Sequence, residues 1–172
     1  MSGHGEREEF HVKVLNYNTV FSWDEAYNVV EQYFAEKGYE KWEKYAHEYH
    51  RKESKEVHSE LHYFKEITDY FLIRVKFIIN SKDLKYVEVE QHGKKRRMLS
   101  GSISFKFGAM FYSDYAGRMT GPHGGSPIWY YIKELYDTFY YNMIKNKYKK
   151  DLINDIDQAS NKLNNYFNYP KS

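Results

Sequence analysis

Apolar and polar positions change their period several times along this chain. Between residues 10 and 21 apolar residues alternate with polar ones, which predicts a first strand. Ser22 and Glu25 then form a capping box, in which the two side chains satisfy the first free amides of a helix. We expect that helix to end at Gly38, since glycine readily adopts the left-handed conformation that closes a helix.

Residues 39 to 54 fit two different periods. Trp42, Tyr45 and Tyr49 have helical spacing, whereas Tyr45, His47 and Tyr49 also alternate as they would in a strand. We favour a second helix for this segment.

From Lys55 onward the period is two, which predicts a meander of about four or more strands. Strands joined by links this short are antiparallel neighbours. Asn80 to Asp83 and the pair His92 and Gly93 are the expected turns, because these residue types favour tight turns. The expected strands have apolar alternation over 57–63, 71–79, 87–89 and 99–111.

A segment rich in glycine, residues 121 to 125, separates this meander from one long helical pattern. Ser126 is the expected cap, Pro127 takes the first helical position, and apolar residues recur at spacings of three and four to residue 168. An antiparallel sheet needs a cover for its apolar face, so a helix of roughly 40 residues is the natural lid. The first half of its apolar stripe is Ile128, Ile132, Leu135, Phe139 and Met143, and the second half is Leu152, Ile156, Ala159, Leu163 and Phe167.

The predicted fold is therefore α+β, with a curved antiparallel sheet, helices after strand one and a long C-terminal helix packed across the sheet. We expect a flexible N-terminus over residues 1–9 and a single domain over 10–168. This order resembles the helix-grip fold of the START/Bet v 1-like (SRPBCC) superfamily. The resemblance rests on topology, and it implies a small apolar ligand held between sheet and helix. Some members are cyclases, hydrolases or protein partners, but no catalytic motif is matched, so no catalytic residue is assigned.

The amino-acid composition excludes several kinds of chemistry for this protein. The chain of 172 residues has no cysteine, which excludes disulfides, cysteine-ligated zinc, iron–sulfur clusters and thiol catalysis. No run of about 18 apolar residues and no apolar core of a secretion signal is present, so we expect a cytoplasmic protein without membrane insertion. We expect no cofactor.

The first functional hypothesis is a binding protein for an apolar or amphipathic small molecule. Aromatic residues make up 19% of the chain, including 19 tyrosines, and such rings line mixed cavities well. Alternatively, the same residues fill a solid core. The expected ligand-binding residues are Phe71, Ile73, Val75, Phe105 and Phe107 on the sheet and Leu135, Tyr136, Phe139 and Tyr140 on the helix.

A second hypothesis is an interaction module for RNA, a ribonucleoprotein or a protein. The net charge is only +2, yet residues 92 to 119 carry 6 Lys/Arg and 1 Asp/Glu. Four adjacent cations could neutralise phosphates, or they could protect an edge from aggregation. They are Lys94, Lys95, Arg96 and Arg97, at a predicted hairpin tip. The lysine-rich segment 145–150 is the second expected contact of such a module.

Three further groups of residues give weaker indications of function. His58, Glu60 and His62 share one strand face, but they span about 13 Å, too far for one metal ion, so we expect solvated surface histidines and no metal. The segment 121–125 lacks the phosphate-binding lysine of a P-loop and is expected to be a connector. An enzyme of the cyclase or hydrolase type is the third hypothesis. It could draw on acid–base carboxylates, although these are expected at the surface: Glu66, Asp69 and Asp114.

Overall fold

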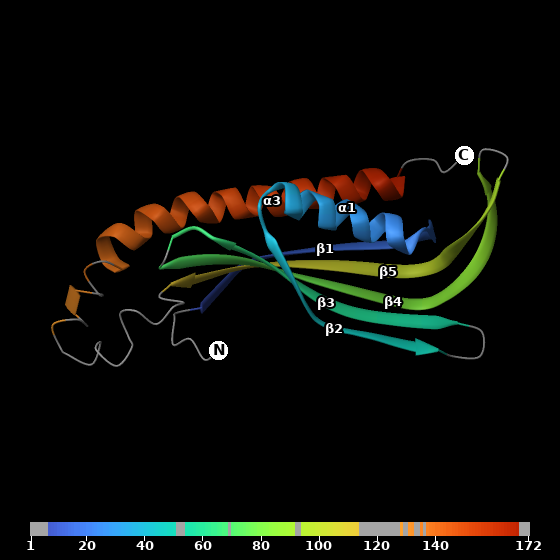
Figure 1. The fold of residues 1–172 in the computed structure, drawn as a ribbon, viewed down its shortest axis with the longest axis horizontal. Coiled ribbons are helices and arrows are strands. Elements are labelled where there is room, and N and C mark those ends of the chain that lie inside the picture. Colours follow the sequence, from blue (N-terminus) through green and yellow to red (C-terminus); the bar gives the residue numbers. More distant parts are fainter. Residues whose placement is uncertain are drawn as a thin grey trace.

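Five antiparallel strands form one curved sheet in the part of the chain that the computed structural model describes, residues 7–50, 54–68, 70–91, 94–113, 128, 131–132, 135 and 137–168. The strand order is β1-β5-β4-β3-β2. Helix α1 follows the first strand and helix α3 lies lengthwise over the concave face (Figure 1), which confirms the predicted α+β, helix-grip arrangement. The elements are β1 (Arg7–Phe21), α1 (Trp23–Glu36), β2 (Glu40–His50), β3 (Lys55–Glu66), β4 (Phe71–Gln91), β5 (Lys94–Ser113), the π-helical turn η1 (Asp137–Tyr141) and α3 (Asn142–Asn168).

The first helix is bounded as the sequence predicts. The Ser22 hydroxyl accepts a hydrogen bond from the Glu25 backbone amide at 3.4 Å, so the serine caps the helix. Gly38 has φ +77°, a left-handed conformation that ends the helix and turns the chain into β2. Four side chains of α1 are buried against the sheet, namely Ala26, Val30, Tyr33 and Phe34.

The prediction of a second helix over residues 39 to 54 is wrong. Glu40 to His50 form the edge strand β2, which pairs with β3 in the register His47 opposite His58. Tyr45 stacks on the His58 ring at a centroid distance of 5.3 Å. Aromatic residues favour a pleated surface on which they meet cross-strand partners, and this pairing outweighs helical spacing.

The turn predicted at residues 80 to 83 is also absent. Strand β4 runs without interruption to Gln91, and the polar residues mark a bulge between Lys82 and Lys85. Asp83 has φ +54° at this bulge, and a Cβ on the neighbouring Gly101 would lie only 2.8 Å from the Asp83 carbonyl oxygen. A bulge bends a strand and increases its twist, in agreement with the β4–β5 hairpin curling back toward the helices (Figure 1).

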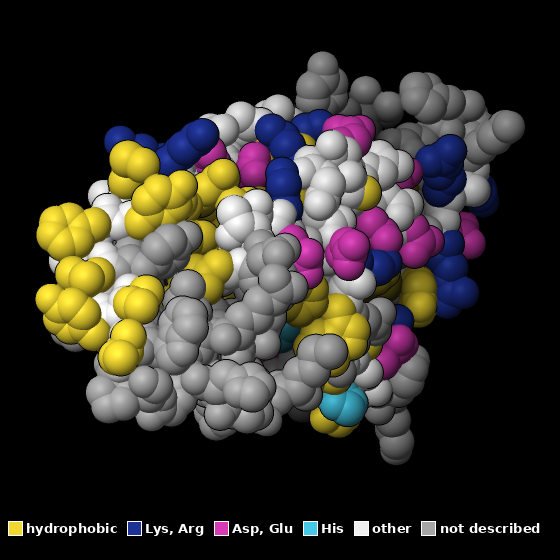
Figure 2. All heavy atoms as spheres, turned by 60° about the vertical axis from the view of Figure 1, so that its left-hand side comes forward, with side chains coloured by type: hydrophobic (Ala, Val, Ile, Leu, Met, Phe, Trp, Pro, Cys, Tyr) yellow, Lys and Arg dark blue, Asp and Glu magenta, His cyan; other side chains and the backbone are white. Residues whose placement is uncertain are grey.

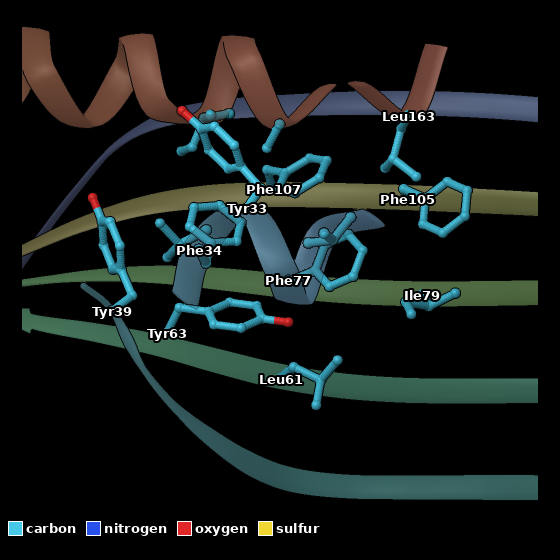
Figure 3. Packing of buried hydrophobic residues seen from close by; sticks show 14 of the residues in the cluster. Tyr33, Phe34, Tyr39, Leu61, Tyr63, Phe77, Ile79, Phe105, Phe107 and Leu163 are labelled. Carbon is cyan, nitrogen blue, oxygen red and sulfur yellow. The ribbon is translucent and has the colours of Figure 1, made fainter. Parts of the chain in front are cut away.

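The core lies between the concave face of the sheet and α3. The Phe77 and Phe107 rings stack with their centroids 4.6 Å apart (Figure 3). The centroids of Phe105 and of Phe167 on α3 are 5.6 Å apart. The second half of the predicted helical stripe is buried here, which confirms that part of the pattern. Its residues are Leu152, Ile156, Ala159, Leu163 and Phe167.

The first half of that stripe does not pack on the core. Its five residues keep between 42% and 77% of their surface exposed, and η1 interrupts the regular helix between Leu135 and α3. A π-helical turn adds a residue per turn and so rotates the apolar positions that precede it away from those that follow. The proposed cap Ser126 and Pro127 lie outside the described residues. The exposed residues are Ile128, Ile132, Leu135, Phe139 and Met143.

Tyrosines join α1 and the residues on either side of it to α3. The Tyr39 hydroxyl donates to the Asp155 carboxylate at 2.9 Å and the Tyr33 hydroxyl lies 3.3 Å from it. Lys37 places its Nζ 3.4 Å from the same carboxylate. At the other end of α3, the Tyr166 hydroxyl donates to the Ser22 carbonyl at 3.2 Å. These contacts connect segments more than 100 residues apart, so they belong to the tertiary structure.

These tyrosines predict a loss of stability in alkali. Burial, the largest cause, raises the pKa of Tyr166 from 10.0 to about 12, and burial together with Asp155 raises the pKa of Tyr33 and Tyr39. The folded protein therefore holds these protons more tightly than the unfolded chain. The stability that these tyrosines contribute should be fully present below pH 10, and it should be lost as the pH rises through about 12. The midpoint of thermal unfolding, followed by circular dichroism from neutral pH upward, checks this. Tyr166→Phe should make the decline less steep, and a flat midpoint through this range would contradict the prediction.

Candidate functional site

A pocket of about 580 Å³ lies between the N-terminal half of α1 and the hairpin of β2 and β3. It is larger than the hollow lined by Tyr17 and Ser102, of about 300 Å³, and the one lined by Leu135 and Phe139, of about 250 Å³. Helix α1 contributes Trp23, Asp24, Tyr27 and Asn28, strand β2 contributes Ala46, His47 and Glu48, and strand β3 contributes Lys55, Val57 and Ser59.

Helix geometry explains how α1 lines this pocket. Residues four positions apart lie on the same side of a helix, so Trp23 aligns with Tyr27 and Asp24 aligns with Asn28. The adjoining face, with Ala26 and Val30, is buried in the core. The aromatic pair is therefore anchored at the flank of a packed helix and faces the edge of the sheet.

The pocket walls are mixed in character. Trp23, Tyr27 and Val57 supply aromatic and apolar surface, while carboxylates and one ammonium supply polar contacts. The Lys55 Nζ lies 2.5 Å from a Glu48 carboxylate oxygen, so the single lysine of the lining is paired within the pocket. Such a lining can hold an apolar body and hydrogen-bond a polar end.

The ligand-binding residues predicted on the sheet lie elsewhere. Phe71, Ile73, Val75, Phe105 and Phe107 share the concave face and are at most 3% exposed. Their rings pack against each other and against neighbouring core side chains, as Phe71 does on Phe111 at 5.4 Å. They do not line the pocket beside α1.

The structure does not place the predicted helix residues with them. Leu135, Phe139 and Tyr140 are exposed by 42%, 77% and 49% and are not part of the buried core. Tyr136 lies outside the described residues. The pocket residues Trp23 and Tyr27 were missed by sequence reasoning. Their spacing is a usable signal only once residues 40 to 50 are known to form a strand opposite them.

Acidic side chains lie close to the cations of the predicted basic hairpin, residues 94–97, and partly neutralise them. Arg96 lies 3.5 Å from Glu25 of α1, and Lys95 lies 3.9 Å from Glu88 on the partner strand. Arg97 stacks over the Tyr86 ring at 3.8 Å. These three cations are exposed, but strand β4 places acidic residues directly beside them. The side chain of the fourth predicted cation, Lys94, lies outside the described residues.

The histidine strand is not solvated as predicted. Glu60 and His62 are each 3% exposed, so the expectation of surface residues is wrong for them. The Glu60 carboxylate accepts a hydrogen bond from the Tyr45 hydroxyl at 3.0 Å, lies 2.8 Å from His62 Nε2 and lies 3.4 Å from Lys76 Nζ. Neighbouring side chains from β2 and β4 cover these groups, which a single strand's pattern does not reveal. His58 is half-buried and contacts Asn80 in the same cluster on the outer face of the sheet.

No group of three histidines, cysteines or carboxylates within the described ranges could hold a metal ion. Glu66 is exposed, and Asp69, Asp114 and the segment 121–125 lie outside the described residues.

Where the structure describes the chain, no helix combines the length and the apolarity needed to cross a membrane. No known protein-family model, curated protein or solved structure matches this chain.

Proposed function

We propose that this protein binds an amphipathic small molecule without chemical turnover, in the pocket between α1 and strands β2 and β3. The observation that carries the proposal is the pocket itself. Its volume of about 580 Å³ lies within the range typical of small-molecule sites, and its lining combines aromatic rings with a few polar groups.

The lining favours a ligand whose polar end is neutral or cationic. Asp24 and Glu48 are the carboxylates of the pocket, and Lys55 is its only lysine or arginine. Because Lys55 is already paired with Glu48, a carboxylate or phosphate on the ligand would meet excess negative charge. Trp23 and Tyr27 can pack on the apolar body and also attract an ammonium group through their ring faces.

The order of strands and helices supports membership of the START/Bet v 1-like superfamily as part of this proposal. The binding position differs from the one expected from that resemblance. The space between the sheet and α3 is filled by side chains such as Phe77, Phe105 and Leu163, so the ligand is placed beside α1 instead. The alternative of an RNA-binding hairpin is less favoured, because Glu25 and Glu88 lie beside its cations.

Replacing Ala46 with tryptophan tests the proposal. Ala46 is exposed and lines the pocket, so an indole at this position should fill the hollow without entering the core. We expect Nile red, a neutral amphipathic fluorophore, to bind the wild-type protein, and the variant to bind it about tenfold or more weakly. Fluorescence titration measures this.

Glu90→Trp is the matched control, since Glu90 is an exposed position on β4 that does not line the pocket. That variant should bind the dye like the wild type. Equal binding by the wild type and the Ala46→Trp variant would refute this pocket as the site. Native mass spectrometry of protein purified from its own host would then show whether any small molecule is retained elsewhere.

A further inference from the structure

The segment that leads into α3, together with the first turn of that helix, carries an exposed apolar surface, called here the terminal patch. Its side chains keep between 42% and 69% of their surface exposed, and 77% at Phe139. Figure 2 shows hydrophobic side chains gathered at this end of the molecule. Single exposed apolar residues are ordinary, but a contiguous group marks a surface that contacts something else. The terminal patch consists of Ile128, Tyr131, Ile132, Leu135, Phe139 and Met143.

The core does not account for these residues. Contact of α3 with the core begins at the partly buried Ile144 and Tyr148, and Leu152 is its first fully buried residue. The preceding end of the helix projects beyond the sheet (Figure 1). The surface there is hollowed rather than filled, since Tyr131, Leu135 and Phe139 line a depression of about 250 Å³.

The charges that follow the patch along the chain are basic as far as Lys150, whereas Lys133, Glu134 and Asp137 lie between patch residues in the sequence. Between Thr138 and Lys150 the chain holds four lysines and neither aspartate nor glutamate. Lys147 and Lys150 are exposed, and both lie within two turns of Met143 along α3. An apolar helical face followed at once by lysines is the pattern of a segment that lies in the interface of an anionic membrane. The long lysine side chains reach the lipid headgroups while the apolar ones enter the acyl boundary.

We propose that the terminal patch docks this protein peripherally on the surface of an anionic lipid bilayer. Phe139 and Met143 enter the boundary between headgroups and acyl chains, and Lys147 and Lys150 contact the anionic headgroups. A second copy of the chain fits less well, because pairing the same end of two molecules would bring both sets of lysines together. This docking is independent of the pocket beside α1.

Vesicle co-sedimentation with the full chain tests the docking. We expect the protein to bind vesicles of equal parts phosphatidylcholine and phosphatidylserine about tenfold or more tightly than vesicles of phosphatidylcholine alone. Phe139→Ser combined with Met143→Ser should weaken binding to the mixed vesicles about a hundredfold, because two apolar side chains no longer leave water. Lys147→Glu combined with Lys150→Glu should remove the preference for phosphatidylserine.

Tyr49→Ser combined with Tyr86→Ser is the matched control, since both rings are more than half exposed and lie outside the patch. That variant should bind like the wild type. All positions are exposed, so each variant should keep the wild-type circular dichroism spectrum. Failure of the wild type to bind either vesicle, or full binding by the Phe139 and Met143 variant, would overturn the proposal. So would light scattering that shows a dimer which this variant dissociates, in the absence of vesicle binding.

Discussion

Phe107→Ala is expected to lower the free energy of unfolding by about 3–5 kcal/mol. Phe107 is fully buried at the centre of the concave face, where its ring stacks on Phe77. Removing the ring forfeits its burial and leaves a cavity, because the surrounding core is close-packed and its side chains cannot all close in. The midpoint of thermal unfolding should fall by roughly 10 °C in a protein of this size.

Denaturation in urea, followed by circular dichroism, measures that loss. Val14→Ala is the control, since Val14 lies on β1 and is 51% exposed. It should change the free energy of unfolding by less than about 0.5 kcal/mol. A loss below about 1 kcal/mol for Phe107→Ala would contradict a packed core here and would favour an open cavity between sheet and α3.

Asp155→Ala is expected to cost about 2–4 kcal/mol, the second largest effect. Asp155 is 9% exposed and accepts the hydroxyls of Tyr33 and Tyr39, with Lys37 also close to its carboxylate. Its removal deprives the buried Tyr39 hydroxyl of its acceptor and Lys37 of a counter-charge, while the Tyr33 hydroxyl keeps the Gln158 side-chain oxygen at 3.0 Å. Because these partners come from α1 and the segment between α1 and β2, the variant should also loosen the docking of α3.

Asp157→Ala provides the comparison on the same helix. Asp157 pairs with Lys13 at 2.5 Å, but its side chain is 45% exposed, so the loss should stay below about 1 kcal/mol. Chemical denaturation of both variants gives the two values. Similar losses for Asp155→Ala and Asp157→Ala would show that burial does not distinguish these carboxylates.

Local signals predicted much of the fold. The capping box at Ser22 and Glu25 marked the start of α1 correctly, because a cap depends only on residues within one turn. Alternation from Ile103 to Phe111 and the stripe from Leu152 to Phe167 identified a sheet face and a helix face that are indeed buried. The period of the apolar positions carries this information without any knowledge of the partner.

The predictions from local sequence are wrong at two places, because pairing with a distant strand decides the structure there. Residues 40 to 50 form a strand because β3 offers an edge with matching aromatic and histidine partners. Residues 80 to 83 continue a strand because Gly101 on β5 accommodates the bulge at Asp83. Turn-forming residues such as asparagine, serine and aspartate occur in bulges as well as in turns, and only the partner strand decides between the two.

The position of the pocket beside α1 could not be predicted from local sequence at all. Its ten lining residues come from three elements, and β2 had been predicted as a helix. Burial of Glu60 and His62 likewise depends on side chains of β2 and β4, so alternation along β3 alone predicted solvation.

The sequence by itself determined the order of strand, helix, meander and closing helix, because propensity, capping and period act within a few residues. Tertiary structure alone decided which half of the C-terminal stripe is buried, where the pocket lies and which charges are neutralised. Each of these depends on distances between segments far apart in the chain, as between Tyr39 and Asp155 or Glu25 and Arg96. A contact of this kind involves one residue from each segment. It therefore produces no periodic pattern of apolar and polar residues from which it could be predicted.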